Sequence, residues 1–127
     1  LVDGLPQNWE LWLDGGHNPA AGESLAAHVS AAWRDRPVHL VVGMMNSKAA
    51  GDFLAPIAAR AETIHSVAIP GEENSFSAEE LAKITNARPM PTVAQAITAI
   101  ISENAEPARI LICGSLYLAG TVLADNV

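Results

Sequence analysis

Short apolar runs alternate along the chain with segments in which apolar residues recur every three or four positions. The apolar runs, which we interpret as β-strands, are residues 9–13, 38–43, 63–69, 87–90 and 109–113. Amphipathic helical segments follow them and begin near residues 19, 49, 77, 92 and 116. The fourth run contains Pro89, which confines it to an edge of a sheet. About five alternations of this kind predict an α/β fold, with a mostly parallel sheet and helices on both faces.

Local residue patterns predict how several helices begin. Ser77 with Glu80, and Thr92 with Gln95, have the spacing of capping boxes, in which two side chains bond each other's backbone N–H groups. Pro56 interrupts the segment between residues 49 and 61, so we expect a kink there or a late helix start at residue 52.

The most distinctive turn follows the first strand and reads LDGGHNP over residues 13–19. We interpret Asn18 as a helix N-cap and Pro19 as the first helical residue, because proline has no N–H group to leave without a partner. Asp14 and His17 then lie between the end of a strand and the electropositive start of a helix. Such a turn suits an anionic or phosphorylated ligand.

Two further turns are expected at the same edge of the sheet. Right-handed crossovers place every strand-to-helix turn of a parallel sheet at one edge, which here collects residues 14–18, 43–48 and 114–117. Open α/β sheets bind their ligands at this edge. Lys48 is the only lysine or arginine in the three turns, and Tyr117 is the only tyrosine of the chain.

Asp14, His17 and Ser115 leave several kinds of site open. Asp14 and His17 could bind a ligand, coordinate a metal, or merely terminate the strand, with Asp14 accepting N–H groups of the turn. We predict no metal site, because two residues rarely suffice and no suitable third ligand is near. With Ser115 the pair also suggests a hydrolytic triad, although the G-x-S-x-G elbow is absent.

Composition and charge limit the class of protein and the partners that the chain can bind. The 127 residues are 50% hydrophobic and 17% charged, which indicates one compact domain. A net charge of −7 with only seven lysines and arginines argues against nucleic-acid binding. No apolar run approaches the roughly 20 residues of a membrane span, and the first residues lack a signal-peptide pattern. Cys113 cannot form an internal disulfide, so we expect a buried structural thiol in a soluble, cytoplasmic protein.

Three motifs resemble those of one enzyme family. LDGGHNP is similar to the L-D-G-A-H-N-P signature of the folylpolyglutamate synthase/dihydrofolate synthase family, within the Mur ligase superfamily. VGM at residues 42–44, followed by Lys48, resembles its G-M-x-x-D-K-D segment, and residues 111–120 resemble its C-G-S-x-Y block. The three motifs occur in the family's order and cover the chain nearly end to end. The likeness is to the Rossmann-like C-terminal domain of these enzymes.

This resemblance implies an activity that needs more than the present chain. Such enzymes join L-glutamate to dihydropteroate, or to a folate already carrying glutamate, using ATP and Mg through an acyl phosphate. Their larger N-terminal ATPase domain holds the phosphate-binding loop, the metal and the pterin. We therefore expect residues 1–8 to lead in from that domain and residues 9–127 to form the glutamate-ligase domain. The isolated domain should be inactive, and the whole enzyme should be monomeric.

The resemblance also implies roles for individual residues. Asp14 corresponds to an aspartate that contacts the nucleotide, at its ribose. Three residues correspond to the glutamate pocket: His17, Ser115 and Tyr117. Asn18 and Lys48 are candidate contacts at the same edge, and no residue is assigned a catalytic proton transfer.

The chain departs from the family pattern at two places. Gly16 stands where the family has alanine, a change expected to cost little beyond the entropy of the turn. Ser47 and Ala49 replace the two aspartates that often flank the lysine, which leaves any role of Lys48 open. The alternative from another class is an α/β module that binds a nucleotide or a small acid without catalysis.

Overall fold

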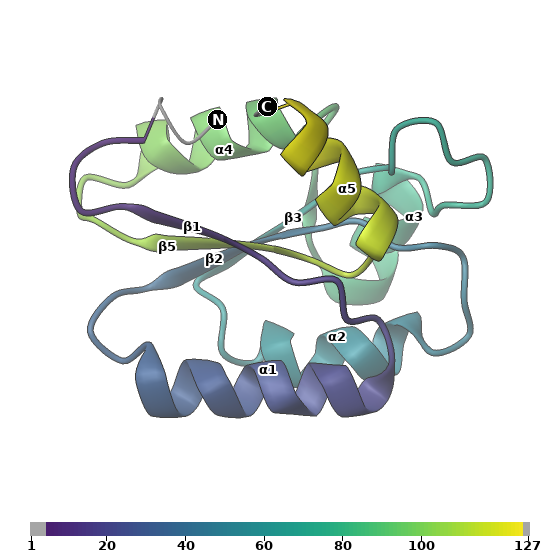
Figure 1. Cartoon of the computed structure of the whole chain (residues 1–127), viewed down its shortest axis with the longest axis horizontal. Coiled ribbons are helices and arrows are strands. Elements are labelled where there is room, and N and C mark those ends of the chain that lie inside the picture. The colour runs from purple at the N-terminus through teal and green to yellow at the C-terminus, as the bar shows by residue number, and fades with distance from the viewer. Residues whose placement is uncertain (1–4, 126–127) are drawn as a thin grey trace.

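A five-stranded sheet forms the centre of the molecule, in a computed structural model that describes residues 5–125 (Figure 1). The strand order is β1-β5-β2-β3-β4, and every strand pair is parallel. The strands are β1 Glu10–Leu13, β2 Val38–Val42, β3 Thr63–Ser66, β4 Arg88–Pro89 and β5 Arg109–Cys113. The parallel α/β fold predicted from the alternation of elements is confirmed.

The outer strands are shorter than the sequence pattern suggests. β3 ends at Ser66, not at residue 69, because its neighbour β4 pairs with only two of its residues before both chains leave the sheet. β4 consists of two residues at the sheet edge, as expected where Pro89 has no N–H group to donate.

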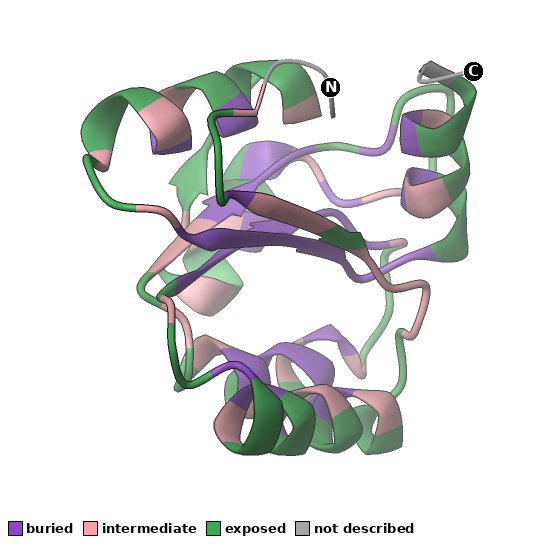
Figure 2. Cartoon of the chain, turned by 60° about the vertical axis from the view of Figure 1, so that its left-hand side comes forward, coloured by how far each residue is buried: buried purple, intermediate pink, exposed green. Residues whose placement is uncertain are grey.

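The helices form one layer on each face of the sheet (Figure 1). One layer contains α1 Pro19–Ala32, α2 Ala50–Ala58 and α3 Ala78–Thr85, and the other contains α4 Val93–Glu103 and α5 Leu116–Asp125. Figure 2 shows buried residues concentrated in the strands and on the sides of the helices that face them. No helix among residues 5–125 has the length and apolar character needed to span a membrane.

The two central strands explain why the sheet needs both layers. All residues of β2 and β5 are buried. Leu40 and Leu111 pack with α1, α2 and α3, whereas Val41 and Ile110 pack with α4 and α5. Burying each such side chain stabilises the fold by roughly 1.5–3 kcal/mol.

Most predicted helix starts are confirmed. Asn18 accepts a hydrogen bond from the N–H of Ala21 at 2.8 Å, and the Ser77 capping box has both of its bonds. Thr92 accepts from the N–H of Gln95 at 3.0 Å, but the return bond, from the Thr92 N–H to the Gln95 side-chain oxygen, is not formed in the described structure. This second capping box is therefore half made.

Of the two outcomes expected from Pro56, a kink or a late start at residue 52, the late start is not found. α2 begins at Ala50, before residue 52, and continues past Pro56. Phe53, Leu54 and Ile57 are all fully buried on its inner side. Their burial outweighs the hydrogen bond that proline cannot make.

Candidate functional site

Three turns meet at the carboxyl end of the sheet, as the topology predicted. A Cβ atom placed on Gly15 would lie 2.3 Å from Cδ2 of Leu116, so the first and third turns touch. Gly114 has a φ of +110°, and a Cβ there would lie 2.6 Å from the carbonyl oxygen of Gly43. Only glycine allows the second and third turns to approach this closely.

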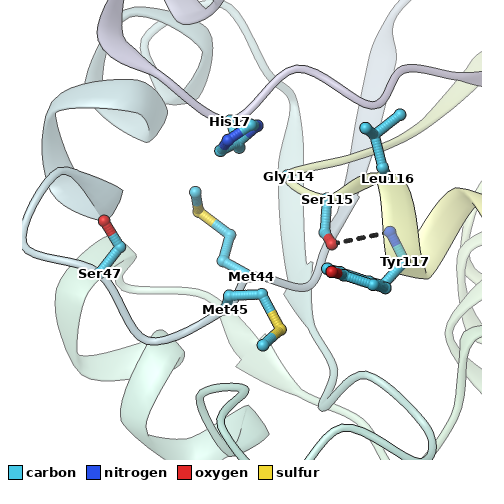
Figure 3. A pocket seen from close by; sticks show the side chains of 8 residues that line it. All are labelled: His17, Met44, Met45, Ser47, Gly114, Ser115, Leu116 and Tyr117. Atoms are coloured by element: carbon cyan, nitrogen blue, oxygen red, sulfur yellow. Dashed lines mark hydrogen bonds between the residues drawn. The ribbon is translucent and has the colours of Figure 1, made fainter.

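The three turns surround a pocket of about 440 Å³ (Figure 3). The first turn contributes one residue, the second three and the third four, which are His17, Met44, Met45, Ser47, Gly114, Ser115, Leu116 and Tyr117. Figure 3 shows these side chains arranged around one space, with the methionines between Ser47 and Tyr117 in this view. Thioether, isobutyl and phenol groups make most of the wall apolar, with a few polar atoms from His17 and the serines.

Ser115 begins helix α5, and its side chain caps that helix. The residue is only 4% exposed, and its Oγ accepts a hydrogen bond from the N–H of Tyr117 at 3.0 Å (Figure 3). Accepting this bond does not use the hydroxyl proton. Ser115 therefore keeps one donor for a ligand in the pocket.

The hydrolytic triad is not assembled. Among residues 5–125, no hydrogen bond joins His17 to Asp14 or to Ser115. Asp14 instead accepts a bond from the N–H of Gly16, 2.7 Å from its Oδ1. Without a neighbouring base the serine hydroxyl is not activated as a nucleophile.

Asp14 lies in the first turn but outside this pocket. It lines a neighbouring groove of about 460 Å³, together with Trp12, Ser24, His28 and Trp33. The backbone N–H of Asp14 donates to the carbonyl of Ile112 at 2.9 Å, which keeps this residue beside the end of β5. The structure thus separates Asp14 from the residues predicted to bind glutamate, while keeping all of them at one end of the sheet.

Comparisons with known proteins show the family. Residues 2–116 match the family described as Mur ligase, glutamate ligase domain. The chain belongs to this Mur ligase family. The resemblance inferred from the three motifs is thereby confirmed.

Individual relatives are much longer than the chain. It is 26% identical over 111 residues to the dihydrofolate synthase/folylpolyglutamate synthase of Escherichia coli (strain K12), which covers 87% of the chain and 26% of that relative. The fold is similar to that of E. coli FolC in complex with DHPP and ADP, with a TM-score of 0.83, 24% identity, and coverage of 96% of the chain and 30% of FolC. A bifunctional folylpolyglutamate synthase/dihydrofolate synthase with Mn, AMPPNP and L-glutamate bound gives a TM-score of 0.78 at 27% identity, with the same coverages of 96% and 30%.

The pocket of this Mur ligase domain contains no lysine or arginine. Lys48 is exposed and lines neither the pocket nor the groove of Asp14. Asn18 is likewise absent from both linings, and its Oδ1 is occupied as the N-cap of α1. Of the six candidate residues, the pocket brings together three: His17, Ser115 and Tyr117.

Five pocket residues were not predicted from the sequence as candidate site residues: Met44, Met45, Ser47, Gly114 and Leu116. Met44 directly follows the buried strand β2 and Gly43, and this position was the available signal. Leu116 is 69% exposed although it lies against Gly15. An apolar residue in a sequence usually predicts a place in the core. That Met44, Met45 and Leu116 line a pocket follows from how the turns meet, which the sequence does not show.

Other reactive groups near the pocket are few. Burial raises the pKa of the Cys113 thiol to about 12, so this residue is the inert buried thiol that its position predicted. Within residues 5–125, no three or more His, Cys, Asp or Glu side chains are grouped in a way that could hold a metal ion.

Proposed function

We propose that the chain is the C-terminal domain of an ATP-dependent ligase that adds L-glutamate to dihydropteroate, to folylpoly-γ-glutamate, or to both, through an acyl phosphate. Family membership and the similarity to folylpolyglutamate synthases support this proposal. In it, residues 1–8 lead in from an N-terminal ATPase domain of the same polypeptide and residues 9–127 form the glutamate-ligase domain. Residues 1–4 and 126–127 of these ranges lie outside the described structure.

One observation carries the proposal: the three turns that bear the family motifs surround one pocket. These turns are far apart in the sequence. Topology brings these turns to one edge of the sheet, and the close contacts at Gly15 and Gly114 join them around a single space. The pocket also lies at the edge where parallel α/β sheets bind ligands.

The pocket supplies groups that suit an amino acid with carboxylates. Ser115 has a free hydroxyl proton, and His17 and Tyr117 offer further polar atoms on the same wall. The start of α5 adds the partial positive charge of a helix N-terminus. Met44 and Met45 give the aliphatic part of the ligand an apolar surface.

Asp14 suits a nucleotide better than it suits glutamate. One of its oxygens already accepts the Gly16 N–H. Its carboxylate would repel the carboxylates of glutamate but can accept hydroxyl groups of the uncharged ribose. We assign Asp14 to the nucleotide, with Asn18 and Lys48 as candidate contacts when the domains close.

ATP and Mg serve the whole enzyme. The described residues form no metal site, so the ion is assigned mainly to the N-terminal domain.

The isolated domain is proposed to be inactive. Its net charge of −7 gives it few cations for phosphate groups, so these must come from the other domain, and closure of the two domains positions the reactants. We propose a monomeric cytoplasmic enzyme whose partners are L-glutamate and the folate or pteroate substrate, without nucleic acid or membrane.

Kinetics of the full-length enzyme test the residue assignments. Asp14→Ala should raise the KM for ATP about tenfold, because it removes an ionised acceptor. Ser115→Ala should raise the KM for glutamate about fivefold, the effect of one neutral hydrogen bond. Ser102→Ala, which removes a helix hydroxyl outside the pocket, serves as control. Unchanged constants in both the Asp14 and the Ser115 variants would reject the assignments.

Calorimetry of the 127-residue chain separates a ligase domain from an independent binding module. The ligase proposal predicts no tight binding of ATP or glutamate by the isolated chain. Tight binding of either would favour the module.

A further inference from the structure

A loop outside the pocket is bonded to one of its walls. The turn that contributes Met44 and Met45 lies against residues 69–76, which connect β3 to α3. The N–H of Asn46 donates to the carbonyl of Asn74 at 2.7 Å, and the N–H of Phe76 donates to the carbonyl of Met44 at 2.9 Å. Met45 and Ser75 form an isolated antiparallel bridge between these two bonds. The backbone of the pocket wall is therefore held from outside.

Ser75 closes the loop that provides this hold. Its Oγ accepts the N–H of Ile69 at 3.2 Å and donates to the carbonyl of Phe76 at 3.3 Å. Its own N–H donates to the carbonyl of Glu72 at 3.2 Å. One half-buried side chain thus joins the first residues of the loop to the last.

Residues 44–46 need these bonds to the loop because both side chains that they contribute to the pocket wall are methionines. Methionine is unbranched and flexible, so its own side-chain preferences fix its position weakly. Met44 is 1% exposed and shares the core cluster that includes Phe76, whereas Met45 is only half-buried. Met45 also packs against the second core cluster, and the backbone bonds of residues 44–46 to the loop help to hold it beside the pocket.

We propose that Ser75 is a positioning residue for this pocket. It holds the loop 69–76 in the shape that fixes residues 44–46, and so sets the width of the space available to the amino acid. Ser75 touches no ligand in this arrangement and is not among the residues that line the pocket. That the ligand is glutamate rests on the proposed function. The hydrogen bonds between the loop and residues 44–46 do not depend on that proposal.

Amide hydrogen exchange on the 127-residue chain tests the link. Ser75→Ala removes both hydrogen bonds of the Ser75 hydroxyl. It should lower the protection of the Asn46 and Phe76 amides at least about fivefold, the loss expected for a single neutral hydrogen bond. The Gly43 amide, bonded to the Cys113 carbonyl, is the internal reference and should not change. Ser75→Thr keeps the hydroxyl in an extended segment and should restore protection, and Ser102→Ala should have no effect at these amides. Unchanged protection in Ser75→Ala would overturn the proposal.

Kinetics of the full-length ligase test the consequence. Ser75→Ala should raise the KM for glutamate about fivefold, with kcat within about twofold and the KM for ATP unchanged, and Ser75→Thr should restore the wild-type value. An unchanged KM for glutamate, despite lost amide protection, would overturn the positioning role.

If the full-length protein does not use glutamate, the proposed function fails and the positioning of the wall is judged separately. The methyl resonances of Met44 and Met45 in the 127-residue chain then decide. A shift in Ser75→Ala that Ser75→Thr reverses supports the positioning role, and unshifted resonances overturn it.

Discussion

Gly16 shows how one residue of a turn can be constrained by its neighbours. The sequence suggested that glycine in place of the family's alanine costs little, and the structure adds that alanine would not fit the present turn without a shift. A Cβ on Gly16 would lie 2.7 Å from the Cβ of Ala21 and 2.9 Å from Oδ1 of Asp14. Alanine would therefore displace the carboxylate that accepts the Gly16 N–H.

We predict that Gly16→Ala destabilises the chain by about 1–3 kcal/mol, the usual cost of overpacking, and raises the KM of the full-length enzyme for ATP. Gly120→Ala is the matched control, since a Cβ at this position in α5 meets nothing within 4 Å. That change should stabilise the chain by about 0.5–1 kcal/mol. Urea unfolding measures both, and equal effects of the two substitutions would contradict the steric argument.

At the scale of elements, the side chain of Glu10 joins the edge strand β1 to neighbouring segments through hydrogen bonds and ion pairs. This carboxylate accepts bonds from Trp12 Nε1 at 2.9 Å, Arg109 Nε at 2.9 Å and Arg36 at 2.6 Å. The bond from Trp12 and then that from Arg109 lower the pKa of Glu10 to about 2. The network lies at the amino ends of the strands, away from the pocket.

Because the pKa of Glu10 is lowered by folding, its ionised form stabilises the chain above about pH 4.5, and this contribution disappears as the pH falls towards 2. We predict that Glu10→Gln lowers the free energy of unfolding at pH 7. The difference between variant and wild type should shrink below pH 4. Urea titrations from pH 2 to 7 measure it, and a difference that stays constant with pH would argue against the ion-pair network.

At the scale of the whole molecule, two histidines lie inside the sheet. His39 in β2 is completely buried and its Nδ1 lies 2.7 Å from the Thr63 hydroxyl, while His65 in β3 is 4% exposed. His39 Nε2 and His65 Nδ1 find no hydrogen-bond partner within residues 5–125. Burial lowers the pKa of both.

Nearby charges modify this effect of burial. Glu62 opposes the pKa lowering at His39 and the neighbouring imidazole adds to it. At His65, Arg88 lowers the pKa further and Glu103 opposes it.

Both histidines therefore take up protons at a lower pH in the folded chain than in the unfolded chain, where protonation occurs below about pH 6.5. The free energy of unfolding should be highest above about pH 6.5. Below that pH it should fall by at most about 1.4 kcal/mol per pH unit for each histidine. Urea unfolding at pH 7.5 and 5.5 measures this loss. His17→Gln, which changes an exposed histidine, should leave the loss unchanged, and equal stability at the two pH values would contradict the account.

Much of the architecture could be predicted because local patterns and topology agree. Alternating apolar runs, Asn18 before Pro19, and Pro89 at an edge each correspond to one local rule of chain geometry. For the pocket, the sequence could predict only that three turns lie at the same edge of the sheet. Contacts between turns and loops far apart in the sequence decide that Met45 forms its wall, that Asp14 lies in a separate groove, and that the loop containing Ser75 is bonded to residues 44–46. No periodicity in the sequence reports such contacts.

The most direct test is the structure of the full-length protein with L-glutamate and a non-hydrolysable ATP analogue bound. The account predicts glutamate within hydrogen-bond distance of Ser115 or His17, between the turns after β1, β2 and β5, and the ribose of the nucleotide at Asp14. Glutamate bound elsewhere, with no contact to the eight residues of this pocket, would contradict it.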